Sequence, residues 1–476
     1  MVFSSIPFIF FFLVLTSILY YLVPFDFKGF KVKNFVLMIF SLIFYAWGEP
    51  IYITLMIFSS IVDYTNGQMI KKYHDNIKMK RLFMIFSVII NLGLLGFFKY
   101  SDFLIVNINN LFGLSIETLN LGLPIGISFF TFQTMSYSID VYRGDVKPED
   151  DFLTFMTYVC MFPQLIAGPI VRYETVAEEL SEREINFEHF ASGLVRFTIG
   201  VFKKVLVANQ VGRLWSTVSL LPGSELSTVM SWLGILAYSL QIYFDFSGYS
   251  DMAIGMGKML GFNYLENFNY PYISKSITEF WRRWHMSLST FFRDYVYIPL
   301  GGSRCSTLLN IRNIAVVWAL TGLWHGADWN FIFWGVYFGT LLIIEKFVLN
   351  NWLKKQHAII QHAYALILIA IGWMIFSSCD IAYPKEYIMS LVGVGTSLVN
   401  DKTLFYLSEY GTVLIIGMIF SMPVYPFLRE KYNNISNKTL ANLITILVTI
   451  VFIVLLIITV SYLVSDTYNP FLYFRF

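Results

Sequence analysis

The chain of 476 residues is 57% hydrophobic and only 13% charged, whereas soluble domains carry about 25% charged residues. Such a composition excludes an ordinary soluble enzyme and indicates a polytopic membrane protein. The net charge of +2, from 33 basic and 31 acidic residues, gives no reason to expect a nucleic-acid partner. The three cysteines have neither disulfide nor zinc-site spacing, so no metal is predicted: Cys160, Cys305 and Cys379.

Apolar runs recur from one end of the chain to the other and predict an all-α fold of membrane helices. The first run, 6–23, is followed by no cleavage site, so we expect a retained helix rather than a signal peptide. Neither an internal repeat nor a long linker divides the sequence, and we treat residues 1–476 as a single integral membrane domain. The further runs are 35–47, 51–70, 82–98, 121–140, 152–170, 191–211, 229–246, 313–323, 329–349, 358–376, 410–427 and 441–463.

Three segments are short or interrupted by glycine or proline, which predicts broken or re-entrant helices at 121–130, 161–170 and 313–323. The polar stretch 172–190 predicts one amphipathic helix on the cytoplasmic side. Basic residues gather in particular loops, and the positive-inside rule places those loops in the cytoplasm: 28–33, 71–81, 346–355 and 429–438.

The stretch QIYFDFSGYSDMAIG (241–255) places two carboxylates, Asp245 and Asp251, on either side of a predicted turn. A metal or proton site is one interpretation of the pair. We favour a second interpretation, in which Ser250 or Asp251 is the N-cap of the next helix. Four further histidines lie in or beside polar segments and are expected to be solvated: His74, His189, His357 and His362.

The stretch 276–302 combines His285 with three arginines, Arg282, Arg283 and Arg293. One interpretation is an anion pocket at the cytoplasmic boundary, because guanidinium groups bind phosphates in bidentate fashion and a phosphorylated acyl donor would be held there. The other is structural, since Glu279 and Arg283 have the i,i+4 spacing of an ion pair and arginines anchor helices at membrane boundaries. At helical spacing the side chains on one face are Trp281, Trp284 and His285.

The segment before His325 must enter the membrane and turn back, because basic residues mark the same side at both of its ends. Arg312 precedes the apolar run, and Lys346 follows the next one. We therefore expect His325 near the turn, with Gly322 and Gly326 allowing the bend. An ionisable ring at membrane depth indicates a functional site.

Two interpretations of His325 remain open from the local sequence. As a neutral imidazole, which burial favours, it would accept the proton of a hydroxyl that attacks an acyl carbonyl. Asp328, three residues later, would then orient the ring. Alternatively, His325 donates a hydrogen bond to a carbonyl that the bend releases. The sequence contains no GxSxG, Walker, HExxH or GxGxxG motif, so classical hydrolase, ATPase and metalloprotease activities have no support.

The two histidine-containing motifs resemble those of one family. The stretches WRRWHMSLSTFFRDYVYIPLGG (281–302) and LTGLWHGADWNFIFWG (320–335) together are similar to the membrane-bound O-acyltransferase family, and most similar to its alginate O-acetyltransferase membrane subunits. Supporting stretches extend from about residue 97 to the end of the chain, and include 161–173, 244–255 and 469–476. The resemblance implies about eleven spanning helices, with re-entrant and horizontal helices, around a funnel or tunnel.

The same resemblance implies an activity and assigns roles to residues. His325 would be the catalytic histidine near the membrane centre, and His285 the second functional histidine on the cytoplasmic side. The acyl donor would be a cytoplasmic thioester such as acetyl-CoA, with no bound cofactor. The acceptor would be a polysaccharide outside the cell membrane, reached through an extracytoplasmic partner transferase.

Two other functions are weighed against this expectation. Within the same enzyme class, the chain would transfer D-alanine to teichoic acid from a carrier protein. From a different class, it would be a non-catalytic exporter or scaffold of a polysaccharide modification complex. Transporters often contain duplicated broken helices, and the absence of a second WHG segment argues against an exporter.

Overall fold

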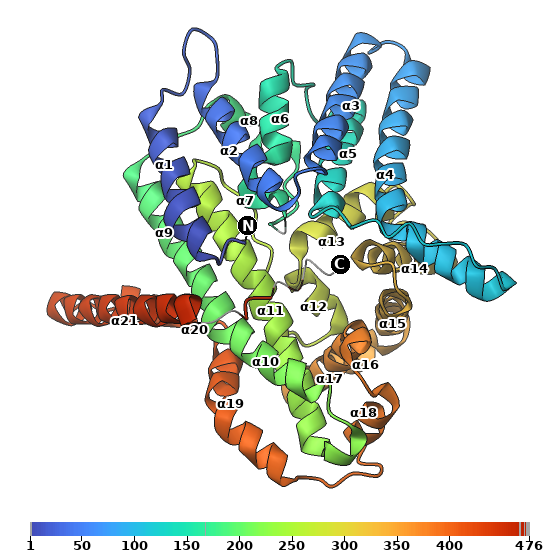
Figure 1. Ribbon diagram of the computed structural model, residues 1–476, viewed down its shortest axis with the longest axis vertical. Coiled ribbons are helices and arrows are strands. Elements are labelled where there is room, and N and C mark those ends of the chain that lie inside the picture. Colours follow the sequence, from blue (N-terminus) through green and yellow to red (C-terminus); the bar gives the residue numbers. More distant parts are fainter. Residues whose placement is uncertain (1, 167, 466–467, 471, 473–476) are drawn as a thin grey trace. The chain divides into compact units, whose positions relative to one another are not determined.

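The computed structural model describes residues 2–166, 168–465, 468–470 and 472, and within these ranges the chain forms helices and no strand (Figure 1). The expectation of an all-α fold is therefore confirmed. The chain divides into two compact units, residues 1–197 with 250–266, and residues 198–249 with 267–476.

The first unit is built from packed helices, several of which are not neighbours in the sequence. Helices α3, α4 and α5 lie side by side, and α2 packs against α6 (Figure 1). Its centre contains a carboxylate, Asp63 of α3, which is fully buried and accepts hydrogen bonds from Ser87, Asn91 and Ser138. These donors come from α4 and α5 and satisfy the carboxylate inside the bundle. The helices are η1 (Phe8–Phe12), α1 (Leu13–Leu22), α2 (Val32–Gly48), α3 (Ile53–Lys72), α4 (Ile77–Phe112), α5 (Ile127–Arg143), α6 (Phe152–Cys160), α7 (Phe162–Leu165), α8 (Tyr173–Ser181) and α9 (Phe187–Phe202), of which the last five residues belong to the second unit.

The second unit carries both histidine motifs. Its longest helix is α11 (Thr228–Met259), whose last ten residues belong to the first unit. The other elements are η2 (Lys203–Ala208), α10 (Asn209–Val218), η3 (Gly223–Glu225), η4 (Pro271–Ile273), α12 (Ile277–Arg283), α13 (Met286–Phe292), η5 (Arg293–Tyr297), α14 (Thr307–His325), α15 (Trp329–Ile344), η6 (Glu345–Leu349), α16 (Asn350–Leu353), α17 (Ala358–Phe376), η7 (Ser378–Asp380), α18 (Pro384–Leu391), α19 (Asp401–Phe420), α20 (Val424–Asn433) and α21 (Lys438–Ser465).

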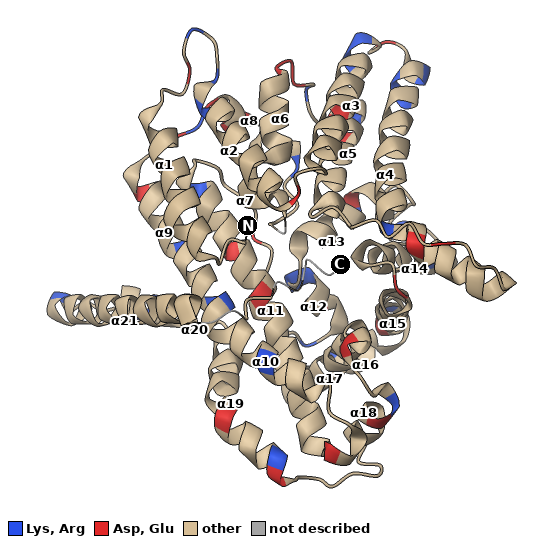
Figure 2. Cartoon of the chain, in the orientation of Figure 1, with Lys and Arg blue, Asp and Glu red and all other residues tan. Residues whose placement is uncertain are grey.

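Five helical segments of the described chain are long and apolar enough to cross a membrane: α4, the continuous stretch Trp329–Leu353, α17, α19 and α21. Charged side chains lie mainly at helix ends and in loops, and α21 is almost free of them (Figure 2). Its most apolar stretch has a mean hydropathy of 3.3 and is only 6% buried. Such an exposed apolar surface is stable in lipid and not in water, as expected for a membrane protein.

Helices α14 and α15 form the hairpin that the charge pattern predicts. Lys346, just after α15, donates a hydrogen bond to Asn310 near the start of α14 at 2.6 Å, so the charged ends lie together. The turn comprises residues 326–328, directly after His325. The helix before the turn is longer than the predicted run 313–323, because residues 307–312, which are of mixed polarity, belong to the same helix.

Gly322 does not allow a bend, contrary to the prediction, because it lies inside α14. An added Cβ at Gly322 would lie 2.6 Å from the carbonyl oxygen of Phe331, and one at Gly335 would lie 2.6 Å from that of Trp318. The two glycines let the backbones of α14 and α15 touch, as small residues do between membrane helices. Of the two predicted glycines, only Gly326 lies at the turn.

Two other predictions about local structure are wrong. Residues 172–190 form two helices, α8 and the start of α9, rather than one. Residues 241–255 contain no turn, because α11 runs through them, so neither Ser250 nor Asp251 is an N-cap. Instead Asp251 pairs with Arg196 at 2.8 Å in the first unit, and Asp245 pairs with the buried Lys204 at 2.6 Å in the second.

The buried pair of Lys204 and Asp245 also holds the last described residues of the chain. Lys204 donates a hydrogen bond to the carbonyl of Pro470, and the backbone N–H of Leu472 donates to Asp245 at 2.9 Å. The side chains of both ions are only 3% exposed, so each neutralises the other where water cannot. This pair accounts for the carboxylate at 245 without a metal ion.

The glycine contact between α14 and α15 generates a stability prediction. We expect Gly335→Ala to lower the thermal unfolding temperature of the detergent-purified protein, because overpacking costs about 1–3 kcal/mol. Gly411→Ala in α19 is the matched control, since a Cβ there meets nothing within 4 Å and alanine favours a helix. Equal unfolding temperatures for the two variants would contradict the backbone contact.

Candidate functional site

His325 is the last residue of α14 and is enclosed by aromatic rings. Its side chain is 6% exposed. The ring centroid lies 5.0 Å from that of Trp324, 4.9 Å from that of Trp334 and 5.4 Å from that of Phe376, with interplanar angles of 78–84°. These edge-to-face contacts from α14, α15 and α17 fix the plane of the imidazole. The ring is thus enclosed mainly by apolar surface.

The residues after His325 form the turn that leads into α15. Gly326 is extended, and an added Cβ would lie 2.2 Å from the ring of Phe331, so only glycine fits beneath that ring. Asp328 is the N-cap of α15 and accepts a hydrogen bond from the backbone N–H of Trp329 at 2.6 Å. This capping bond accounts for the exposed carboxylate, and the geometry gives no support to the predicted orienting role of Asp328.

His285 lies between two helices and not on the face of one. The chain leaves α12 at Trp284, and His285 has φ 44° and ψ 55°, in the left-handed region. The prediction that Trp281, Trp284 and His285 share one helical face is therefore wrong for His285. A non-glycine residue in this conformation costs about 1–3 kcal/mol, and such strain is found mainly at functional sites.

Asn267 stabilises this conformation through hydrogen bonds to the two residues that follow His285 and through its contact with the ring itself. Its backbone carbonyl accepts a hydrogen bond from Met286 N at 3.0 Å, and its side-chain Oδ1 accepts from Ser287 N at 3.1 Å and from Ser287 Oγ at 2.9 Å. The same Oδ1 lies 3.1 Å from Nδ1 of His285. Because Oδ1 can only accept, Nδ1 carries the proton and the lone pair of the ring is on Nε2.

Burial sets the protonation state of His285, which lies outside the five apolar segments. The side chain is 2% exposed, and desolvation lowers its pKa to about 3. The ring is therefore neutral at physiological pH. A neutral ring can accept a proton at Nε2. It carries no positive charge with which to bind an anion.

A single indole lies between the two histidines. The centroid of Trp324 is 5.9 Å from that of His285 and 5.0 Å from that of His325. Phe246 of α11 packs edge-on against the other side of His285 at 4.7 Å. The tertiary structure thus brings the two predicted histidines to one aromatic region of the second unit.

Sequence reasoning missed most of the residues that form this region. Five are buried aromatic residues, and Asn267 supports the backbone at His285. The residues are Phe246, Asn267, Trp318, Trp334, Trp373 and Phe376. A signal was present, because eight of the eleven tryptophans fall within residues 281–373: 281, 284, 318, 324, 329, 334, 352 and 373. Their mutual contacts depend on α12, α14, α15 and α17 coming together, and periodicity within one helix does not reveal them.

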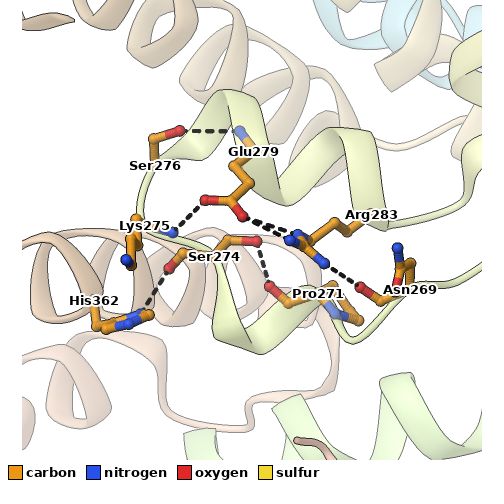
Figure 3. A network of polar contacts seen from close by, with 8 residues as sticks. All are labelled: Asn269, Pro271, Ser274, Lys275, Ser276, Glu279, Arg283 and His362. Carbon is orange, nitrogen blue, oxygen red and sulfur yellow. Dashed lines mark hydrogen bonds and ion pairs between the residues drawn. The ribbon is translucent and has the colours of Figure 1, made fainter. Parts of the chain in front are cut away.

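Helix α12, which carries two of the arginines, is anchored at its first turn. Ser276 accepts a hydrogen bond from the backbone N–H of Glu279 at 3.0 Å (Figure 3). Buried Glu345, at the end of α15, accepts from the backbone N–H groups of Ile277 at 2.7 Å and Thr278 at 2.9 Å. These bonds satisfy the donors that a helix N-terminus leaves open, and a negative charge there complements the helix dipole.

The structure separates the three arginines that the sequence groups together. Figure 3 shows Arg283 held by Glu279, at 2.9 Å, and by the carbonyl of Asn269, at 3.1 Å, which confirms the i,i+4 ion pair. Arg293 pairs with the adjacent Asp294 at 2.6 Å. Arg282 is exposed and forms no ion pair with any residue that the structure describes. Of the three, only Arg282 lacks a carboxylate partner among the described residues.

The other histidines differ from one another in their surroundings. His74 is exposed beside Asp75, as expected for a solvated ring. His362 is not in a solvated loop, because it lies in α17 and its Nδ1 donates to the carbonyl of Ser274 at 3.2 Å (Figure 3). It therefore supports the backbone next to α12.

Sequence comparisons identify the proteins that this chain resembles. The sequence model of the membrane-bound O-acyltransferase family matches residues 146–383, which contain both histidines. The chain is 37% identical to the probable alginate O-acetylase AlgI of Azotobacter vinelandii, over 100% of both chains. It is 32% identical to the peptidoglycan O-acetyltransferase of Helicobacter pylori, over 100% of this chain and 98% of that protein.

The chain is also similar, at lower identity, to an enzyme that transfers a different acyl group. The teichoic acid D-alanyltransferase of Bacillus subtilis is 28% identical over 53% of this chain and 68% of that protein. The family match and the full-length relatives agree with the apolar helices of the structure. The chain therefore belongs to the membrane-bound O-acyltransferase family and is a multi-pass membrane acyltransferase.

Proposed function

We propose that the protein moves an acetyl group from cytoplasmic acetyl-CoA to a hydroxyl, for O-acetylation of an extracellular or cell-wall polysaccharide. The observation that carries the proposal is the placement of two buried histidines around Trp324 in a member of this family. The relatives that align over the whole chain are named for O-acetylation, of alginate in one case and of peptidoglycan in the other.

His325 is the catalytic base in this proposal. It accepts the proton of the acceptor hydroxyl while the hydroxyl oxygen attacks the carbonyl carbon of the thioester. The C–O bond forms, the C–S bond breaks, and the imidazolium returns the proton to the leaving thiolate. The surrounding rings of Trp334 and Phe376 exclude water, which would otherwise hydrolyse the thioester.

His285 is the second functional histidine of the same site. With Nδ1–H donating to Asn267, its Nε2 accepts a proton or a hydrogen bond from a reacting group. Its strained backbone keeps this nitrogen in one orientation, so the ring needs no reorganisation during transfer. We assign it a role on the donor side, next to the helix that carries the arginines.

Arg282 is the first candidate to bind the phosphates of the donor. It is exposed, and no ion pair with the described residues competes for it. Arg283 and Arg293 contribute positive potential although each has a carboxylate partner. The bidentate geometry of a guanidinium suits a phosphate better than an ammonium does.

The wider arrangement follows the family. We propose a single integral domain in the cell membrane, with about eleven spanning helices around a tunnel that carries the acyl group. An extracytoplasmic partner transferase would receive the group and pass it to the polysaccharide. An acceptor on the far side of the membrane would explain why the reacting histidine lies at the closed end of the α14–α15 hairpin.

The role of His325 can be measured directly. We expect His325→Ala to abolish ester-linked acetate on the cell-surface polymer, with a loss of at least about 100-fold, because general base catalysis contributes that much. The readout is acetate released by mild base, at equal amounts of membrane protein. His362→Ala is the control, since that histidine only supports the backbone of Ser274. Unchanged acetate in the His325 variant would contradict the proposal; loss of ester-linked D-alanine instead would identify the other acyl group.

The neutral state of His285 generates a prediction about pH. Asn267→Asp places a carboxylate beside Nδ1, which stabilises the imidazolium and raises the pKa of His285 from its value of about 3. Below the raised pKa the ring is protonated and Nε2 no longer accepts a proton. We expect the transfer rate of the variant to fall as pH decreases from about 8 to 5, and to recover as pH rises.

The matched control for this pH experiment is Ser287→Ala, which removes another partner of the same Oδ1 without adding charge. Its pH profile should follow that of the wild type. Identical profiles for Asn267→Asp and Ser287→Ala would contradict a function for neutral His285.

Substitutions of Arg282 and Arg283 should have different effects on acetyl transfer and on stability. We expect Arg282→Gln to raise the KM for acetyl-CoA by about tenfold with little change in kcat, as the loss of one charge-assisted contact implies. Arg283→Gln should instead lower thermal stability, because it breaks the ion pair with Glu279. The measurement is acetyl transfer by purified protein at varied donor concentration. An unchanged KM for Arg282→Gln would exclude this arginine from donor binding.

A further inference from the structure

Two cations are buried beside each other in the first unit, far from the histidine motifs in sequence. Lys33 is 8% exposed and Arg183 is 9% exposed. Both lie against the same ring, since Lys33 Nζ is 4.5 Å and the Arg183 guanidinium carbon 5.5 Å from the centroid of Tyr20. No carboxylate of the described residues forms an ion pair with either one.

The hydrogen bonds of the two cations go to neutral acceptors. Lys33 Nζ donates to the carbonyl of Tyr20 at 2.6 Å. Arg183 donates from Nε to the Tyr20 hydroxyl at 2.7 Å, and from Nη1 to Asn34 Oδ1 at 2.8 Å and to the carbonyl of Glu179 at 2.9 Å. Its Nη2 is buried and has no hydrogen-bond acceptor within the described chain. One donor of this buried guanidinium is thus left without an acceptor in the described chain.

Aromatic rings surround Arg183 but do not neutralise it. The guanidinium carbon lies 4.5 Å from the ring centroid of Phe262 and 5.0 Å from that of Phe25. Such contacts attract a cation without removing its charge. Two like charges out of water repel each other and lose hydration, and proteins normally pair such groups with anions. The missing component of this site is therefore an anion.

The neighbouring hairpin indicates where that anion comes from. Phe27 and Phe30 form a bridge around Lys28 and Gly29, and the two phenylalanines are 61% and 47% exposed. Exposed aromatic rings interleaved with lysines are typical of a segment that lies in the headgroup layer of a membrane. This loop is also one of those that the positive-inside rule places in the cytoplasm.

We propose that Lys33 and Arg183 form a binding site for the phosphate of an anionic phospholipid of the cytoplasmic leaflet. The lipid phosphate accepts from Nη2 of Arg183 and neutralises the cation pair, while the acyl chains lie against the exposed rings of Phe27 and Phe30. The lipid would tie α1, the start of α2 and the segment after α8 together. Basic sites between helices at this depth bind lipid headgroups in the same way.

The site is tested with detergent-purified full-length protein and three probes: phosphatidylglycerol, phosphatidylcholine and inorganic phosphate. We expect phosphatidylglycerol to raise the unfolding temperature, and phosphatidylcholine and inorganic phosphate not to. Native mass spectrometry of the wild type should show a retained anionic lipid. Stabilisation by inorganic phosphate alone would overturn the lipid assignment and indicate a soluble phosphorylated ligand.

Variants connect the lipid to the two cations. Lys33→Met should weaken the phosphatidylglycerol response by about tenfold or more in concentration, because it removes one charge of a buried pair. It should also stabilise the lipid-free protein, since the repulsion with Arg183 is relieved. Arg183→Lys keeps the charge but removes Nη2, and it should weaken the response while the protein still folds.

The matched control is Lys28→Met, which removes an exposed lysine of the same loop and should leave the response within about twofold. The proposal is overturned if Lys28→Met and Lys33→Met weaken the response equally, since general attraction of a basic loop to anionic lipid would then explain it. It is also overturned if the wild type shows no preference for phosphatidylglycerol over phosphatidylcholine.

Discussion

The close approach of α14 and α15 is the contact on which the site depends. Gly322 and Gly335 allow the two backbones to touch, and the short turn after His325 closes the hairpin. The imidazole is then held at the closed end, against Trp334 of the returning helix. A side chain between the helices would separate them and would also open the aromatic enclosure of His325. The close packing of α14 and α15 therefore also determines the environment of the reacting imidazole.

The second unit neutralises its buried charges with specific partners. Asp245 is paired with Lys204, and buried Glu345 accepts two backbone hydrogen bonds at the start of α12. Each arrangement removes the cost of an isolated charge in a medium of low polarity. What remains near the aromatic region is two buried imidazoles, with Arg282 as an exposed cation on α12. This combination suits a reaction that moves a proton between neutral groups and recognises a phosphorylated donor. Lys33 and Arg183 of the first unit depart from this pattern, which is why they indicate a ligand.

Several local predictions failed because tertiary contacts override short-range signals. The Ser-Gly-Tyr-Ser sequence at 247–250 is typical of a turn, yet it continues α11, since buried helices in membranes tolerate small and polar residues when neighbours pack against them. Gly248 has that role, because an added Cβ would lie 2.8 Å from the carbonyl of Gly200. The helix is interrupted at His285, also because of a contact distant in sequence. Asn267, eighteen residues earlier, supplies hydrogen bonds that stabilise the left-handed conformation of His285.

The sequence by itself determined the class of the protein, its two histidine motifs and the hairpin that contains His325. These follow from composition, from the side of the membrane that basic residues mark, and from motif resemblance, all of which are local or additive properties. Only the tertiary structure decided that Trp324 lies between the two histidines, that Asn267 sets the tautomer of His285, and that Asp328 caps a helix. It also decided which of the three arginines have a carboxylate partner, and that Lys33 and Arg183 lie against the same ring, that of Tyr20. Each of these depends on contacts between segments distant in the chain, and the free energy of such contacts is not encoded in any one segment.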